Sequence, residues 1–144
     1  MRTSASLSIN PATTSLGLRA SSIGQVLVFT VNSPTGTRDD LWILPHGPDP
    51  KPVPLLEQAF DQTDGQISPD GRWIAYTSNE SGSNEVFVRA LMENAGGTPT
   101  LGPNLLVSRG GGRSARWRAD SRELLYQSLS GAIMAVPIGS RTVG

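Results

Sequence analysis

Short apolar runs alternate with clusters of turn-forming residues along most of this chain. Most runs have four to seven residues, rich in Val, Ile, Leu, Phe, Tyr and Trp, and they lie at 26–31, 41–44, 73–77, 86–88, 105–107, 124–126 and 133–138. Gly, Pro, Asn, Asp and Ser stand between them, where tight turns need them. No window keeps the 3.6-residue period of an amphipathic helix. The pattern therefore predicts an all-β protein: a sandwich, a barrel or a propeller.

An internal repeat selects among these β folds. The segment 66–76 aligns with 116–126, and a weaker copy begins at 24–29. The matched pairs are Asp70 with Asp120 and Tyr76 with Tyr126, at an offset of 50 residues, and Phe29 with Tyr76, at an offset of 47. Each copy is followed by a second apolar strand. A period of about 45 to 50 residues with about four short strands is that of a propeller blade. The sequence thus predicts a partial β-propeller of about three four-stranded antiparallel blades, arranged as an open arc.

The repeat divides the chain into a degenerate or poorly ordered segment at 1–22, propeller repeats at 23–138 and a tail at 139–144. Blade one is expected over about 16–60, with strands at 16–20, 26–31, 40–44 and 53–56. Blade two is expected over 61–109, with strands at 64–68, 72–78, 85–90 and 104–108. Blade three is expected over 110–138, with strands at 114–118, 123–128 and 132–137 and no outermost strand.

The turn of the repeat has a physical explanation. In Ser68-Pro69-Asp70-Gly71, the proline pre-sets φ at the second position, the aspartate can accept a hydrogen bond from the backbone ahead, and the glycine takes a left-handed conformation. In the third copy Asp120 is retained and Ser121 replaces the glycine. The uninterrupted apolar run at 73–76 that follows is typical of a strand buried on both faces between stacked blades.

These residues resemble the TolB-type, WD40-like PD40 β-propeller repeat, in which S-P-D-G precedes an apolar strand that ends in an aromatic residue. The resemblance covers about residues 23–138. A narrower resemblance is to the C-terminal propeller repeats of bacterial eukaryotic-like serine/threonine protein kinases. The residues that carry it are Asp39-Asp40-Leu41-Trp42-Ile43-Leu44-Pro45, Lys51-Pro52, residues 78–86 and Met134-Ala135-Val136-Pro137. Both resemblances imply a binding or scaffolding surface with no catalytic residue.

Composition excludes several function classes. The 144 residues include 12 basic and 12 acidic side chains, so the formal net charge is zero, which argues against a polybasic nucleic-acid or membrane binder. There is no cysteine, which excludes disulfides, zinc–thiolate sites and thiol nucleophiles. The single histidine, His46, follows a proline in a loop, and no Gly-x-Ser-x-Gly elbow accompanies it. No cofactor and no membrane-spanning segment is expected.

The run Gly110-Gly111-Gly112, followed by Arg113, Arg116 and Arg118, is the strongest candidate for an anion or partner contact. Glycine amides and arginines bind anions, but the run lacks a following Gly-Lys-Ser/Thr and opens no helix. We therefore interpret it as a tight turn between two blades. Arg116 and Arg118 then share one strand face, with Trp117 on the other. The carboxylate pairs Asp39 and Asp40, Asp61 and Asp64, and Glu80 and Glu85 fit turns and have no calcium-loop spacing.

The leading hypothesis is a non-enzymatic propeller segment that recognises a protein or another ligand, within a larger TolB-like or kinase-linked protein. One alternative is the gating propeller of a prolyl-oligopeptidase-like serine hydrolase without its catalytic domain, and another is a truncated reading frame. Three blades are fewer than the 4 to 8 of a closed propeller. We therefore expect a protein partner or self-association through open blade edges. The compartment is extracytoplasmic for a TolB-like or membrane-kinase parent and cytoplasmic otherwise.

Overall fold

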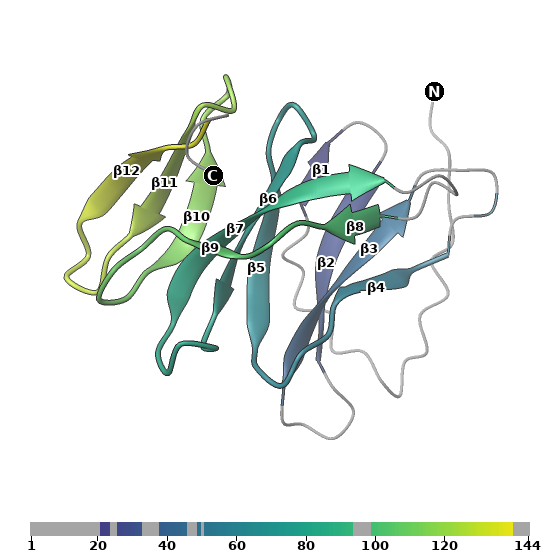
Figure 1. Cartoon of the computed structure of the whole chain (residues 1–144), viewed down its shortest axis with the longest axis horizontal. Helices are drawn as coiled ribbons and strands as arrows, with labels where there is room; N and C mark the ends of the chain where they lie inside the picture. Colours follow the sequence, from purple (N-terminus) through teal and green to yellow (C-terminus); the bar gives the residue numbers. More distant parts are fainter. Residues whose placement is uncertain are drawn as a thin grey trace.

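Three antiparallel sheets follow one another along the long axis of the molecule (Figure 1). The computed structural model describes residues 21–23, 26–32, 38–45, 49, 51–93 and 99–139. Its strands are β1 (Ser21–Ile23), β2 (Val26–Asn32), β3 (Asp39–Pro45), β4 (Val53–Leu56), β5 (Gln62–Ile67), β6 (Trp73–Ser78), β7 (Glu85–Glu93), β8 (Pro99–Leu101), β9 (Leu105–Leu106), β10 (Arg113–Trp117), β11 (Glu123–Gln127) and β12 (Ile133–Pro137).

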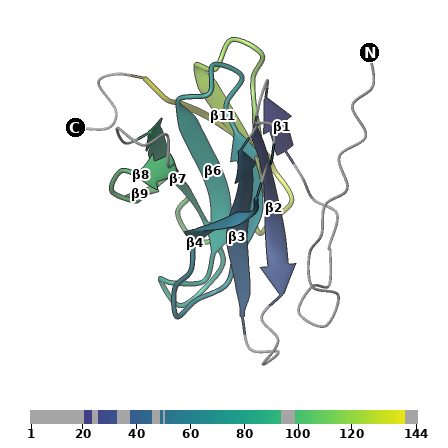
Figure 2. The ribbon, with the colours of Figure 1, turned by 90° about the vertical axis from the view of Figure 1, so that its right-hand side faces the viewer.

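Each sheet is one blade with its strands in sequence order. Blade one is β1-β2-β3-β4, and blade three is β10-β11-β12. Blade two is β5-β6-β7, with both β8 and β9 paired to the outer edge of β7. The first strands β1, β5 and β10 are neighbours, as the inner strands of adjacent blades are. The side view shows β1, β2 and β3 in front of the blade-two strand β6 (Figure 2). The predicted all-β partial propeller is confirmed.

The boundaries differ from the prediction at two places. The inner strand expected at 16–20 lies outside the described residues, and the first described strand, β1, begins at Ser21, inside the segment expected to be degenerate. The outer strand of blade two, predicted at 104–108, is shorter than predicted, because β9 covers Leu105–Leu106 alone, and the structure adds β8 at Pro99–Leu101, which the sequence did not predict. Gly102, Pro103 and Asn104 separate β8 from β9: the Gly102 amide donates to the carbonyl of Ala90 at 2.9 Å, and Pro103 has no amide hydrogen.

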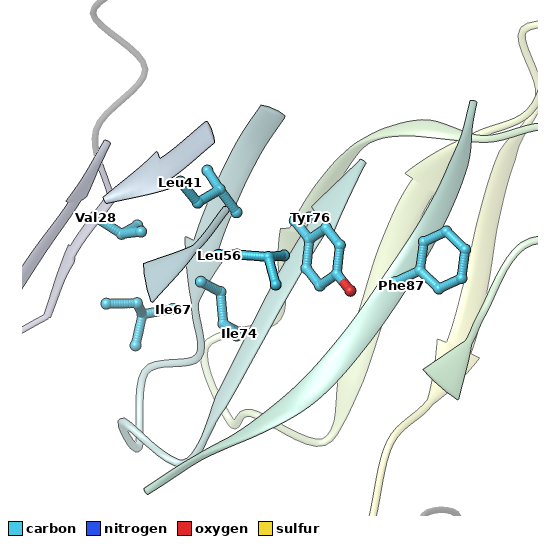
Figure 3. Close-up of a cluster of buried hydrophobic side chains, with 7 residues drawn as sticks. All are labelled: Val28, Leu41, Leu56, Ile67, Ile74, Tyr76 and Phe87. Atoms are coloured by element: carbon cyan, nitrogen blue, oxygen red, sulfur yellow. The ribbon is translucent and has the colours of Figure 1, made fainter. Parts of the chain in front are cut away.

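Two apolar clusters join the three blades. Between blades one and two lie Val28, Leu41, Leu56, Ile67, Ile74, Tyr76 and Phe87 (Figure 3). Between blades two and three lie Ala75, Val86, Val88, Ala115, Leu124, Tyr126 and Ile138. The central strand β6 therefore serves both clusters: Ile74 and Tyr76 point to one neighbour and Ala75 to the other. All three are fully buried, as the apolar run predicts, and the alternation follows from the two-residue period of a strand.

Candidate interaction face on the third blade

The segment Ser68–Gly71 forms a turn held by side-chain and main-chain hydrogen bonds, and Asp70 Oδ1 accepts the Arg72 amide at 3.1 Å. The Ser68 hydroxyl donates to Asp70 Oδ1 at 2.6 Å and accepts the Trp73 amide at 3.0 Å. The Gly71 amide donates to the Ser68 carbonyl at 2.8 Å, and Gly71 has a φ of 74°. Pro69 occupies the second turn position, exposed to solvent. Ser68, Pro69, Asp70 and Gly71 thus build the turn.

The third copy of the turn explains why serine replaces glycine there. Ser121 has a φ of 62°, close to that of Gly71, and Asp120 Oδ1 accepts the Arg122 amide at 3.0 Å. The Ser121 hydroxyl accepts the Asp70 amide of the neighbouring blade at 2.9 Å. The serine therefore tolerates a left-handed backbone that favours glycine and supplies a link between the two turns.

The glycine-rich turn between blades two and three already holds an anion from its own chain. Glu85, which is 6% exposed, accepts the Gly111 amide at 2.8 Å and also accepts a hydrogen bond from the Ser108 hydroxyl. The Gly112 amide donates to the Asn84 carbonyl at 2.9 Å. A carboxylate thus takes the place that a phosphate would need, and the geometry is that of a tight inter-blade turn.

The three candidate arginines have intramolecular partners. Arg116 contacts Asp64 of blade two at 3.2 Å. Arg118 lies 3.8 Å from Asp120 and 3.6 Å from Glu123. Arg113 donates to Gln127 Oε1 at 3.3 Å.

Trp117 lies between Arg116 and Arg118 in the sequence and packs at the junction of blades two and three. Its Nε1 donates to the Gln66 carbonyl at 2.9 Å. The indole therefore ties β10 to β5 and is a packing residue.

The remaining polar candidates either contact other parts of the chain or lie outside the described residues. Asp61 Oδ1 accepts the Asp39 amide at 3.0 Å. Burial raises the pKa of Asp40, with the nearby Glu57 carboxylate adding to the effect. His46 is among the residues that the structure does not describe. No group of three or more potential metal ligands occurs among the described residues, and none of the described segments is a helix able to cross a membrane.

The open face of blade three, defined here as Leu125, Ile133 and Ala135, is apolar and uncovered. Leu125 pairs with Ala135 across β11 and β12. Ile133 is 70% exposed, Ala135 is exposed and Leu125 is half-buried. Among the described residues no element packs on this face. Blade three is the last in the row of blades, and β12 lies at that end of the molecule (Figure 1).

Blade two shows what normally covers such a face. By the same repeat and strand register, the residues that correspond to the open face are Ala75, Val86 and Val88. Those three are completely buried, because β10 and β11 of the next blade pack on them. Repeat-equivalent positions are thus buried at one junction and exposed at the other. The sequence predicts self-association through open blade edges but does not single out these three residues, although the repeat offset of 50 residues relates Leu125 to Ala75.

The edge of blade three adds main-chain groups to this face. In blades one and two, β4 and β9 pair with the outer side of the third strand. Among the described residues no strand pairs with the outer side of β12. An unpaired strand edge is a template for another strand.

Comparison with known proteins supports the fold. No family model matches the sequence, and no curated protein matches it. Among solved structures, the crystal structure of TolB from Acinetobacter baumannii is similar, with a TM-score of 0.57 and 15% sequence identity. The similarity covers 87% of this chain and 33% of that one, so the chain spans about a third of the length of that TolB chain. At this identity the likeness establishes a shared β-propeller architecture.

Proposed function

We propose that this chain is a non-enzymatic recognition segment whose open face on blade three binds another antiparallel blade. The observation that carries the proposal is the exposure of Leu125, Ile133 and Ala135 at positions whose blade-two equivalents are buried by the next blade. For the isolated chain, the partner blade belongs to a second copy. The formal net charge of zero leaves no overall repulsion to oppose this association.

The chemistry of the face fits a sheet better than a small ligand. It is a row of aliphatic side chains beside an unpaired strand edge, and a sheet offers both apolar cover and main-chain hydrogen bonds. Burying a side chain such as Ile133 contributes about 1.5–3 kcal/mol. The proposed contact therefore repeats the inter-blade packing already present twice within the chain.

We propose a non-enzymatic role because the candidate polar side chains already have partners within the chain. The Glu85 carboxylate accepts a backbone amide of the glycine turn. Arg116 and Arg118 form ion pairs with carboxylates of the same chain. Groups engaged in this way stabilise the fold rather than activate a substrate. The wider setting that we propose, a TolB-like or kinase-linked protein, is supported by the S-P-D-G repeat and by the TolB-like fold.

The solution mass of the full chain tests this proposal, with Ile133→Asp as the variant. Leu106→Asp is the matched control, because Leu106 is 54% exposed and lies on β9 of blade two, away from the open face. We expect the wild type and the control to have a multiple of 15.2 kDa, and Ile133→Asp to be a monomer with an unchanged circular dichroism spectrum. A wild-type monomer that melts cooperatively would overturn the proposal.

A further inference from the structure

A polar cleft of about 240 Å³ lies between blades two and three, apart from the open face. Its lining residues are Thr63, Asp64, Thr77, Asn84, Arg113, Ser114 and Gln127. All of them carry hydrogen-bonding side chains, and they come from β5 and β6 and the residue before β7 in blade two and from β10 and β11 in blade three. Drug-sized ligands occupy pockets of about 300–1,000 Å³, so this cleft fits a smaller and polar ligand.

Two strand bulges place residues at the cleft. Asp64 and Ser114 are 50 residues apart and have φ values of 55° and 56°. Each lies where the register of an inner strand shifts, between Thr63 and Gln66 in β5 and between Arg113 and Arg116 in β10. A bulge redirects side chains relative to a regular strand. The left-handed backbone conformation costs stability at a non-glycine residue. Asp64 and Ser114 both have this conformation, and both line the same cleft.

The charges at the cleft leave one cation in excess. Asp64 is paired with Arg116 at 3.2 Å, so that charge is neutralised. Arg113 is exposed, and its one hydrogen bond to a described side chain is to the uncharged Gln127. With no ion pair to another described residue, Arg113 is free to bind an anion. Beside its ion pair with Arg116, the nearby Asp64 carboxylate keeps lone pairs that can accept an N–H group.

A buried hydroxyl adds an independent observation. Thr77 is 5% exposed and lines the cleft, and its Oγ1 has no hydrogen-bond partner in the described part of the chain. A buried polar group without a partner is costly, and most such groups have one. Rotation about χ1 moves the threonine hydroxyl from one staggered position to another, which lets a ligand in the cleft supply the missing partner.

We propose that the cleft binds a carboxylate that stands beside an N–H donor, as at a peptide C-terminus or in a free amino acid. Arg113 forms the charge-assisted hydrogen bonds to the carboxylate. The Asp64 carboxylate and the Thr77 hydroxyl receive the N–H group. The small volume admits the terminal residue and leaves the remainder of a peptide outside.

Amide chemical shifts of the full chain, titrated with four probes, test this assignment. The probes are N-acetylglycine, glycine, N-acetylglycinamide and inorganic phosphate. We expect N-acetylglycine to shift the amides of Thr77 and Ser114 and to bind about tenfold more tightly than N-acetylglycinamide, which lacks the carboxylate. Tighter binding of N-acetylglycine than of glycine identifies a peptide terminus, and the reverse identifies a free amino acid.

Substitutions distinguish binding in the cleft from nonspecific attraction to charge on the protein surface. We expect Arg113→Gln to weaken N-acetylglycine about tenfold and Thr77→Val about threefold, whereas Arg122→Gln, which changes an exposed arginine outside the cleft, has no effect. Circular dichroism verifies that each variant is folded. The assignment is overturned if no probe shifts these amides, if phosphate or N-acetylglycinamide binds as tightly as N-acetylglycine, or if Arg122→Gln weakens binding equally. Since the open face takes no part, these outcomes are independent of the self-association proposed above.

Discussion

Replacing Glu85 with alanine removes the hydrogen-bond acceptor of the glycine turn between blades two and three. The carboxylate of Glu85 accepts the Gly111 amide at 2.8 Å and the Ser108 hydroxyl. The Ser108 hydroxyl oxygen also accepts the Val86 amide at 2.8 Å. All of these groups are buried. The variant therefore leaves a buried amide without its acceptor, and it frees the turn that carries the chain into blade three.

The expected loss follows from these contacts. A hydrogen bond to a charged group contributes about 1.5–3 kcal/mol, and two of them are lost. The variant also removes the cost of burying a carboxylate, and Ser108 can reorient. We therefore expect the free energy of unfolding to fall by about 3 kcal/mol and the melting temperature by roughly 10 °C. Glu85→Gln retains one acceptor oxygen and should lose about half as much.

Urea denaturation followed by tryptophan fluorescence measures this change, at one fixed protein concentration because self-association shifts apparent stability. Glu57→Ala is the control, since Glu57 is an exposed glutamate and its replacement should change stability by less than about 0.5 kcal/mol. A Glu85→Ala variant as stable as this control would refute the view that the carboxylate fixes the glycine turn. The same view predicts that inorganic phosphate does not bind at the wild-type turn.

Three further substitutions test other parts of the fold. Gly112→Ala should lose about 2 kcal/mol in the same urea assay, because its Cβ would lie 2.6 Å from the Cβ of Ser108, whereas Gly139→Ala, with nothing within 4 Å, should be neutral. Burial raises the pKa of Tyr76 to about 12 from 10.0, so the unfolded chain ionises first and about 3 kcal/mol of stability is lost as pH rises between these values. Tyr76→Phe should be about as stable as wild type at pH 7 and lose less stability on the way to pH 12. Trp117→Phe removes the hydrogen bond to a blade-two carbonyl and should cost about 1 kcal/mol by thermal melting; an unchanged melting temperature would contradict its role as a tie between blades.

The strands and their repeat are predictable from sequence because they depend on local patterns. The run at 73–76 has no polar residue, and the structure buries it on both faces. The S-P-D-G turn specifies its own backbone, and in its imperfect copy Ser121 has a φ of 62°, close to the 74° of Gly71. In these places residue type and conformation are directly linked.

The inter-blade contacts are not predictable in the same way. The partners of Glu85 lie 23 and 26 residues further along the chain, and Arg116 pairs with a carboxylate 52 residues before it. No local pattern encodes such pairs. The bulges at Asp64 and Ser114 also lack a signal, because neither residue is the glycine that a left-handed backbone favours. The glycine turn was recognisable as a turn, but not the carboxylate that occupies it.

The protection of a single thiol on the open face tests the central claim most directly. The chain contains no cysteine, so Ile133→Cys introduces one reactive group on the open face and Leu106→Cys introduces one on the outer strand of blade two. The labelling rate by a maleimide reagent is measured as the protein concentration rises. We predict that the rate falls with concentration for Ile133→Cys and stays constant for Leu106→Cys. Equal, concentration-independent rates for both variants would contradict the claim that the open face of blade three is a docking surface for a second blade.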